Sequence, residues 1–269
     1  MDSTHTGRSV EKFDIVEFPF ALSGGRPKRV CVPKCATMDA AQIRFARPWE
    51  YQTLVQTYLQ TARGGSFVEV GANLGTDTVI ACDFFKTCYA FEPSSANRAL
   101  LQKTIELYGI TNVHVFGSAV GDRPGRAAFF LKGGEATGSH SLCVNDPDMT
   151  AQEEVEIVTL DSVFPQTVRD VTYLHIDTEG HDIKVLQGAR QFIARQANRP
   201  VIRMEFQPTT LALHGSSIGD LTAIMDEFQY KVFFMAQNFM TPLSPRSLAE
   251  MFSLWQGGKG WIDIYLSPW

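Results

Sequence analysis

The sequence has no apolar stretch long enough to cross a membrane, no excess of positive charge and no set of cysteines that pairs. Its apolar runs stay well below the roughly 18 residues of a membrane span. With 24 Lys and Arg against 29 Asp and Glu, the formal net charge of −5 gives no general attraction to nucleic acid. Five cysteines, an odd number, fit no disulfide framework. The polar N-terminus lacks an apolar signal region. We therefore expect a cytoplasmic protein with neither a membrane nor a nucleic-acid partner.

A further absence concerns the turn that follows the apolar run 66–70. It has two glycines, Gly71 and Gly75, where a dinucleotide-binding turn usually has three. No Lys or Arg occurs from residue 66 to 85, whereas Glu69 and Asp77 flank the turn. Two carboxylates would repel a pyrophosphate but suit S-adenosylmethionine (SAM), which carries an ammonium and a sulfonium. The turn therefore favours SAM over NAD, although an oxidoreductase and a turn that binds nothing remain as alternatives.

A carboxylate stands at the right distance from this turn to bind a nucleoside. Glu92 ends the next apolar run and lies 21 residues after Gly71 (92 − 71). In doubly wound sheets an acid at about this spacing binds the ribose hydroxyls of a nucleoside cofactor. This spacing strengthens the prediction of a nucleoside site.

From residue 66 onward, strand and helix signals alternate, which predicts an α/β fold with a parallel sheet covered by helices. We expect one domain over 66–269, preceded by an N-terminal extension over 1–65 with short strands and a helix. Strands are predicted at 67–70, 87–91, 113–120, 125–131, 155–160, 171–177, 201–206, 230–235 and 261–266, and helices at 76–85, 94–108, 181–196 and 217–228. The N-terminal extension and two long insertions, 132–150 and 238–260, are predicted acceptor walls. The apolar residues of the second insertion could form a lid, pack on the last strand, or contact a second subunit in a homodimer.

Acidic residues gather at the predicted ends of the strands. Glu69, Glu92, Asp177 and Glu205 each lie at or just before such an end, and Glu179 follows closely. Ligands of open α/β sheets bind beyond the carboxyl ends of the strands. We therefore expect a polar site at one rim of the sheet.

Taken together, these segments resemble the FkbM-type SAM-dependent methyltransferases over roughly residues 50–236. The matching segments are 67–75 (FVEVGANLG), 91–93 (FEP), 118–122 (SAVGD), 138–142 (GSHSL), 176–180 (IDTEG) and 204–208 (MEFQP). The first two are shared by many class I methyltransferases, and the IDTEG element followed by a strand ending in Glu is more specific. The resemblance implies a Rossmann-like, seven-stranded, mostly parallel sheet with helices on both faces. It also implies O-methylation of sugars, polyketides or related small molecules.

The resemblance also implies which residues bind SAM. The methionine end would lie against Glu69, Gly71, Asn73 and Gly75, with Thr76 beside them. Glu92 would hold the ribose, and Ser118 and Ala119 would flank the adenine. Asp177 would face the methionine ammonium or the reaction centre.

For the base that deprotonates the acceptor hydroxyl, the sequence offers His181, His140, Asp177 and Glu205. His175 lies inside a predicted strand and reads as a hydrogen-bonded core residue. We assign no metal; if one binds, Asp177, Glu179 and Glu205 would hold Mg²⁺. Instead of binding a metal, Glu179 could cap the next helix, and Glu205 could form a hydrogen bond with the backbone or with the acceptor.

The prediction is a SAM-dependent O-methyltransferase. A SAM-binding module without catalysis, and a methyltransferase acting on nitrogen or carboxylate, remain alternatives. Methylation of nucleobase nitrogens is disfavoured because no Asn/Asp-Pro-Pro-Tyr/Phe element follows the strand 171–177.

Overall fold

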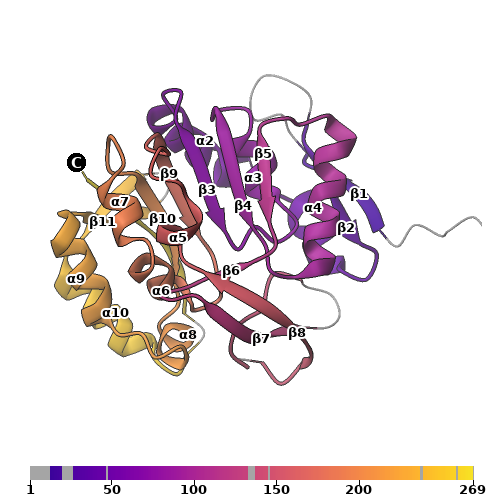
Figure 1. Ribbon diagram of the computed structural model, residues 1–269. Coiled ribbons are helices and arrows are strands. Elements are labelled where there is room, and N and C mark those ends of the chain that lie inside the picture. The colour runs from indigo at the N-terminus through magenta and orange to yellow at the C-terminus, as the bar shows by residue number, and fades with distance from the viewer. Residues whose placement is uncertain are drawn as a thin grey trace, which may run out of the picture.

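The computed structural model describes residues 13–19, 27–46, 48–132, 137–144, 146–236, 239–258 and 260–268. Its centre is an eight-stranded sheet with the order β12-β11-β13-β10-β9-β3-β4-β5 (Figure 1). These strands are β3 (Ser66–Val70), β4 (Thr87–Phe91), β5 (Val113–Phe116), β9 (Val171–Ile176), β10 (Val201–Phe206), β11 (Lys231–Ala236), β12 (Phe239–Leu243) and β13 (Ile262–Ser267). The sheet is mostly parallel, and β13 inserts antiparallel between β10 and β11.

The α/β, Rossmann-like prediction is confirmed, and the strand count needs one correction. Seven of the eight strands lie in the predicted segments. The eighth, β12, belongs to the segment 238–260, which was predicted as a long insertion. It folds back antiparallel on β11 and extends the sheet at its edge.

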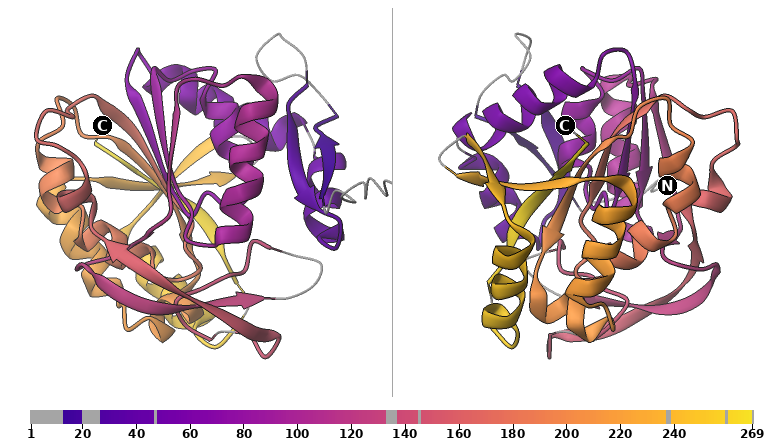
Figure 2. Two further views of the ribbon diagram at one scale, coloured as in Figure 1. Left: turned by 45° about the vertical axis from the view of Figure 1, so that its right-hand side comes forward. Right: turned by 90° about the vertical axis from the view of Figure 1, so that its left-hand side faces the viewer.

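Helices cover both faces of the sheet because alternate strand residues point to opposite sides (Figure 2). Val68 and Val70 pack into one buried cluster, whereas Phe67 belongs to another on the opposite face. The first cluster also takes in side chains of α5 (Leu160–Val163), α6 (Asp182–Gln187), α7 (Arg190–Ala194), α8 (Pro208–Leu213), α9 (Ile218–Phe228) and α10 (Pro245–Trp255). The opposite face is covered by α2 (Pro48–Thr61), α3 (Thr76–Ala81) and α4 (Ser95–Tyr108).

A second sheet of three strands lies across one end of the central sheet, at the bottom of Figure 1. It has the order β6-β8-β7 and comprises β6 (Ala119–Val120), β7 (Gly125–Lys132) and β8 (Met149–Val158). The strand predicted over 113–120 is therefore wrong as a single element. Its first half is β5 of the central sheet, and its second half is β6 of the small sheet.

The N-terminal part packs beside α4 (Figure 2, left). It contains the hairpin of β1 (Phe13–Glu17) and β2 (Arg29–Pro33), followed by α1 (Thr37–Arg44). The backbone N–H of Cys31 donates to Thr104 Oγ1 on α4 at 3.0 Å. Val30 and Ile43 share one buried cluster with Phe67 of the central sheet. The first helices and the sheet are therefore held by a common core.

Two further predictions differ from the structure. The helix predicted over 181–196 is two helices, α6 and α7, interrupted at Gly188. This glycine packs so closely that an added Cβ would lie 2.0 Å from the carbonyl oxygen of Gly121. In the second predicted insertion, α10 buries Leu248 and Phe252 in the cluster that contains Val68 and Val70. This helix packs on the domain rather than forming a lid. Among the described residues, no helix has the length and apolarity needed to cross a membrane.

Candidate active site

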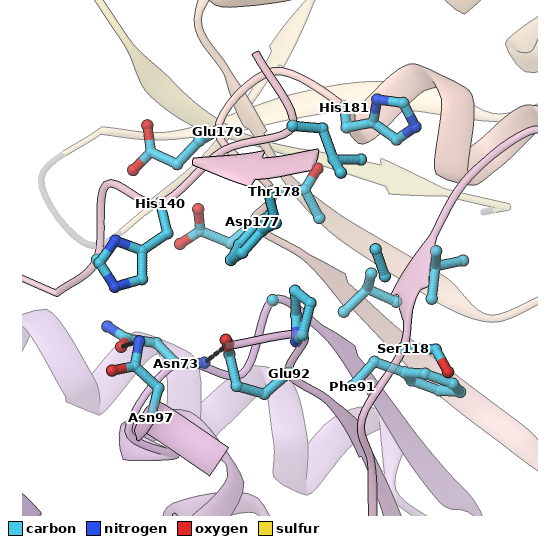
Figure 3. Close-up of a pocket in the computed structure, with 18 of the residues that line it drawn as sticks. Asn73, Phe91, Glu92, Asn97, Ser118, His140, Asp177, Thr178, Glu179 and His181 are labelled. Atoms are coloured by element: carbon cyan, nitrogen blue, oxygen red, sulfur yellow. Dashed lines mark hydrogen bonds between the residues drawn. The ribbon is translucent and has the colours of Figure 1, made fainter. Parts of the chain in front are cut away.

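A cavity lies between the carboxyl ends of β3, β4 and β9 and the small sheet (Figure 3). We call it the first cavity. It is lined by residues from both sheets and from the segment 137–142, among them Gly71, Asn73, Phe91, Glu92, Asn97, Ser118, Ala119, Thr137, Gly138, His140, Asp177, Thr178, Glu179 and His181.

At the first position of the turn that follows β3, only glycine fits the backbone without strain. Gly71 has φ +87°, and a Cβ there would lie 1.7 Å from the carbonyl oxygen of Asp177. Asn73 also has a left-handed φ of +50°. This conformation directs its backbone N–H to Glu92 Oε2 at 2.7 Å, as Figure 3 shows. The close approach of β3 and β9 therefore places the turn and Asp177 side by side.

Glu92 is fixed from two directions. In addition to Asn73, the backbone N–H of Ser94 donates to Glu92 Oε1 at 2.8 Å. The side chain is only 4% exposed. Burial raises the pKa of Glu92 to about 7, although the two N–H donors oppose this shift. The carboxylate is held at the wall of the first cavity, where the sequence predicts the ribose site.

A second, wider cavity lies on the other side of the same turn. Its lining includes Asp39, Gln42, Leu54, Glu69, Thr76, Asp77, His175, Arg203, Glu205, Met235, Trp261, Ile262, Asp263 and Tyr265. Gly71, Asn73, Gly138, Asp177 and Glu179 line both cavities. The two cavities therefore meet at these residues, of which only Asp177 and Glu179 titrate.

The predicted methionine-binding residues divide between these cavities. Gly71 and Asn73 line both, whereas Glu69 and Thr76 line only the second cavity. Gly75 is in the lining of neither. It has φ +82°, and a Cβ there would lie 2.2 Å from a side-chain carbon of Leu101. Gly75 therefore shapes the turn against α4.

A network of charged side chains forms part of the wall of the second cavity. His175 Nδ1 lies 3.2 Å from Glu69 Oε1 and 3.4 Å from Asp77 Oδ2. Arg203 donates to Asp77 at 2.7 Å and to Asp263 at 2.7 Å. Burial and Arg203 lower the pKa of His175, but its hydrogen bond with Glu69 and the charge of Asp77 outweigh them and raise it. His175 is thus buried and hydrogen-bonded, as the sequence predicts, and it also lines the second cavity.

This network corrects the charge argument made from the sequence. The turn has no cation near it in the sequence, but β10 brings Arg203 to Asp77. The charge of Asp77 is therefore compensated within the protein. Asp177 and Glu179 have no such salt bridge among the described residues, so they are the acids left to face a cationic ligand.

Asp177, Glu179 and Glu205 converge at the meeting point of the cavities. Carboxylate oxygens of all three lie within 4.8 Å of one another. Withdrawal from water and the charges of Asp177 and Asp182 raise the pKa of Glu179 to about 8. Withdrawal from water and the charges of Asp177 and Glu179 raise the pKa of Glu205 to about 11. Glu205 Oε2 has no hydrogen-bond partner among the described residues. These three carboxyl groups can exchange protons with a bound hydroxyl group, or they can coordinate a divalent cation.

The two predicted histidine bases occupy different surroundings. His140 lies in the wall of the first cavity, where its Nδ1 accepts from the backbone N–H of Lys132 at 3.0 Å. His181 is 9% exposed and turns toward His214, with their Nδ1 atoms 3.0 Å apart. Burial, with the neighbouring charge of His214, lowers the pKa of His181 to about 3. Its geometry is that of a packed core residue and does not favour the base role.

The sequence did not single out Asn97, Thr137 or Trp261 as site residues. Asn97 and Thr137 line the first cavity, and Trp261 lines the second with 58% of its surface exposed. The position of Asn97, one turn inside the helix after the FEP element, was the only signal that could have identified it. Thr137 and Trp261 reach the cavities through long-range packing.

Comparison with solved structures gives methyltransferases of low similarity. A precorrin-6y C5,15-methyltransferase from Geobacter metallireducens GS-15 shares 10% identity at a TM-score of 0.40, over 79% of this chain and 86% of that one. An rRNA methylase from Streptococcus thermophilus shares 12% at 0.45, over 83% and 97%. A dimethyladenosine transferase from Plasmodium falciparum shares 12% at 0.44, over 82% and 61%. These similarities are too low to transfer an acceptor, and the expected absence of a nucleic-acid partner stays a prediction.

Comparison with curated proteins gives no match. The family model described as "Methyltransferase FkbM domain" matches residues 69–232, which is more than half of the 269 residues. The matched region begins at Glu69 of β3 and ends at Val232 of β11. It therefore contains the glycine turn, Glu92 and the convergent carboxylates. The chain belongs to the family of methyltransferases with an FkbM domain.

Proposed function

We propose that the protein is a SAM-dependent methyltransferase that transfers the methyl group to a hydroxyl of a small molecule or sugar. The observation that carries this proposal is Glu92, whose carboxylate is held by two backbone N–H groups at the wall of the first cavity. A carboxylate at the end of the second strand, facing the glycine turn, is the arrangement that binds ribose hydroxyls.

SAM would occupy the first cavity with its adenosine between β4 and the small sheet. Ser118 and Ala119 line this side, as expected for the adenine. The methionine end would extend past Gly71 and Asn73 toward Asp177. Asp177 and Glu179 would then face the ammonium and the sulfonium, whose positive charges favour the ionised form of both carboxyl groups. This placement would put the methyl group where the cavities meet.

The acceptor would enter through the second cavity. Methyl transfer to oxygen is an in-line displacement at the sulfonium methyl, so the acceptor oxygen must lie in line with the breaking bond and lose its proton. Alignment of the reactants can contribute about 7–11 kcal/mol, and a positioned base about 10²–10⁴-fold in rate. Glu179 is the group best suited as the base, because it lines both cavities and its pKa of about 8 lies close to neutral pH.

A divalent cation is the second way in which this site could activate the hydroxyl. Asp177, Glu179 and Glu205 offer the oxygen donors that Mg²⁺ prefers. When bound, the cation would lower the pKa of an acceptor hydroxyl as a Lewis acid. Both routes rest on the same three carboxylates, and chelation distinguishes them.

Calorimetry with S-adenosylhomocysteine (SAH) tests the donor assignment. We expect micromolar-range binding by the unaltered protein and at least tenfold weaker binding by Glu92→Ala. Glu106→Gln, an exposed change on the neighbouring helix, is the matched control and should bind as the unaltered protein does. Binding of SAH by Glu92→Ala with unchanged affinity would contradict the proposal.

The acceptor atom is tested separately with SAM that carries a labelled methyl group. After reaction with panels of sugars, phenols, amines and carboxylic acids, the labelled product is treated with mild base. Methyl esters release the label, whereas ethers and amines retain it, and mass spectrometry separates the latter two. A product methylated on nitrogen or carboxylate would replace the hydroxyl assignment. SAH binding without transfer to any panel would favour the module without catalysis.

A further inference from the structure

Asp39 connects the N-terminal part of the chain to the wall between the two cavities. It lies on α1, outside the family-matched region 69–232. Its Oδ2 accepts hydrogen bonds from the backbone N–H of Thr137 at 2.8 Å and from Thr137 Oγ1 at 2.9 Å. Asp39 lines the second cavity and Thr137 lines the first. One carboxylate thus fixes a residue of the other cavity.

Thr137 in turn contacts the turn that shapes the first cavity. Its Oγ1 lies 3.0 Å from Asn73 Oδ1, and its carbonyl oxygen accepts from Asn97 Nδ2 at 3.4 Å. Asn97 Nδ2 also donates to Asn73 Oδ1 at 2.8 Å. The hydroxyl has a single proton to share between Asp39 and Asn73, whereas the backbone N–H of Thr137 serves Asp39 alone.

These contacts end at the proposed ribose carboxylate. Asn73 is the residue whose backbone N–H holds Glu92 Oε2 at 2.7 Å. Asn73 has a left-handed φ of +50°, a conformation that costs energy for residues other than glycine and is maintained by surrounding contacts. Thr137 and Asn97 supply such contacts on its side chain. Asp39 therefore stands at the start of a hydrogen-bonded series that runs through Thr137 and Asn73 to Glu92.

The carboxylate of Asp39 is not what packs α1 onto the protein. That contact is made by Ala40 and Ile43, which are 8% and 2% exposed. No salt bridge of Asp39 occurs within the described parts of the chain. Its two hydrogen bonds go to Thr137, and hydrogen bonds to a charged group are among the stronger ones in proteins. Removal of the charge should therefore act on Thr137 and leave the helix packed.

We propose that Asp39 is a positioning residue of the donor site, through which the N-terminal part holds Thr137 and Asn73 in the geometry that binds SAM. This inference rests on the proposed function, because it takes the first cavity as the SAM site. The donor site would then be incomplete in the matched region 69–232 alone. The inference predicts an effect on SAM affinity that exceeds any effect on the chemical step, since no hydrogen bond joins Asp39 to Asp177 or Glu179 among the described residues.

The test compares Asp39→Asn with the unaltered full-length protein. We expect about tenfold weaker SAH binding by calorimetry and a similar increase in KM for SAM. At saturating SAM, kcat should stay within about threefold. Asp83→Asn is the matched control, because it removes the negative charge from the 2.7 Å ion pair of Lys28 with Asp83. This ion pair also joins the N-terminal part to the domain, and neither residue lines a cavity. Its SAH affinity should be unchanged.

Thr137 provides a second variant that does not alter α1. Thr137→Val removes the hydroxyl and should weaken SAH binding by a few fold, whereas Thr137→Ser should restore nearly full affinity. In the Asp39→Asn background, Thr137→Val should cost less than it does alone, because both changes weaken the hydrogen bond between the Thr137 hydroxyl and residue 39. Equal SAH affinity of Asp39→Asn, Thr137→Val and the unaltered protein would overturn the inference and leave the proposed function intact. No SAH binding by the unaltered protein would overturn both.

Discussion

His181 and His214 face each other in the core, with their Nδ1 atoms 3.0 Å apart. One ring must donate its Nδ1 proton and the other must accept it, so at least one is the less common tautomer. Ser141 Oγ lies 3.1 Å from His214 Nε2 and ties the segment 137–144 to this pair. Burial lowers the pKa of His181 to about 3 and that of His214 to about 4. Both rings are therefore neutral in the folded protein at neutral pH.

This histidine pair should make the fold sensitive to acid. The folded pKa values lie below the unfolded value of about 6.5, so the unfolded chain binds more protons. The stabilisation is present above pH 6.5 and is lost as the pH falls toward 4 and 3. We expect the melting temperature to fall between pH 7 and 5, and His214→Gln to reduce this fall. His114→Gln, an exposed change, should leave it unaltered. The same pH dependence in all three proteins would contradict the assignment.

The ionisation of Glu92 should appear in the pH dependence of cofactor binding. Ribose hydroxyls donate to the carboxylate, and burial raises the pKa of Glu92 to about 7. SAH affinity should therefore rise by about tenfold from pH 6 to pH 8, as the group loses its proton. Calorimetry across this range measures the effect. Glu92→Gln should bind SAH weakly at every pH. If the SAH affinity of Glu92→Gln still rose from pH 6 to pH 8, the rise would belong to another group.

Glu205→Gln should stabilise the folded protein, although it removes one of the three convergent carboxylates of the site. Withdrawal from water and the repulsion of Asp177 and Glu179 raise the pKa of Glu205 to about 11, well above its unfolded value. A group of this kind stabilises the folded state only at low pH, and the stabilisation is lost as the pH rises above about 4.5. The amide removes this loss, so we expect a melting temperature about 2–4 °C higher at pH 8. At pH 5 the two proteins should differ little, and a lower melting temperature at both pH values would disprove the repulsion.

Trp261 should affect the acceptor and leave the donor alone. It lines the second cavity beside Met235 and Ile262 and keeps 58% of its surface exposed. An exposed aromatic face at the rim of a polar cavity is suited to stacking on a ring of the acceptor. We expect Trp261→Ala to raise KM for the acceptor by about tenfold, with KM for SAM unchanged. Trp261→Phe should recover most of the loss. A shift in KM for SAM would place Trp261 in the donor site instead.

Chelation separates the side-chain base from the metal alternative. With Glu179 as the base, turnover should persist after treatment with EDTA and should not increase with added Mg²⁺. The pH profile of kcat should then show a limb near 8, the pKa of Glu179. Glu179→Gln should remove this limb. Activity that is lost with EDTA and restored by Mg²⁺ would establish the metal mechanism in its place.

The positions of the central strands could be predicted largely from the sequence, because each buried parallel strand is a short apolar run between turns. β4 and β10 lie where the sequence predicts them, over 87–91 and 201–206. The interruption at Gly188 escaped prediction, since nothing in the local sequence shows that this glycine packs on Gly121. The segment 239–258 escaped it as well. Its apolar residues suit a lid or a core equally, and only the contact with α8 and α9 decides between them.

The sequence by itself determined the family, the glycine turn and the acid at its distance, because local backbone geometry and short spacings impose them. Tertiary structure alone decided which charges remain for a ligand. Arg203 lies 126 residues from Asp77 and forms a salt bridge with it, whereas Asp177 and Glu179, which line both cavities, form none within the described parts of the chain. It also buried His181 against His214 and brought Asp39 to Thr137. Such contacts depend on how strands far apart in the chain are stacked, and a linear pattern of residue types does not record this.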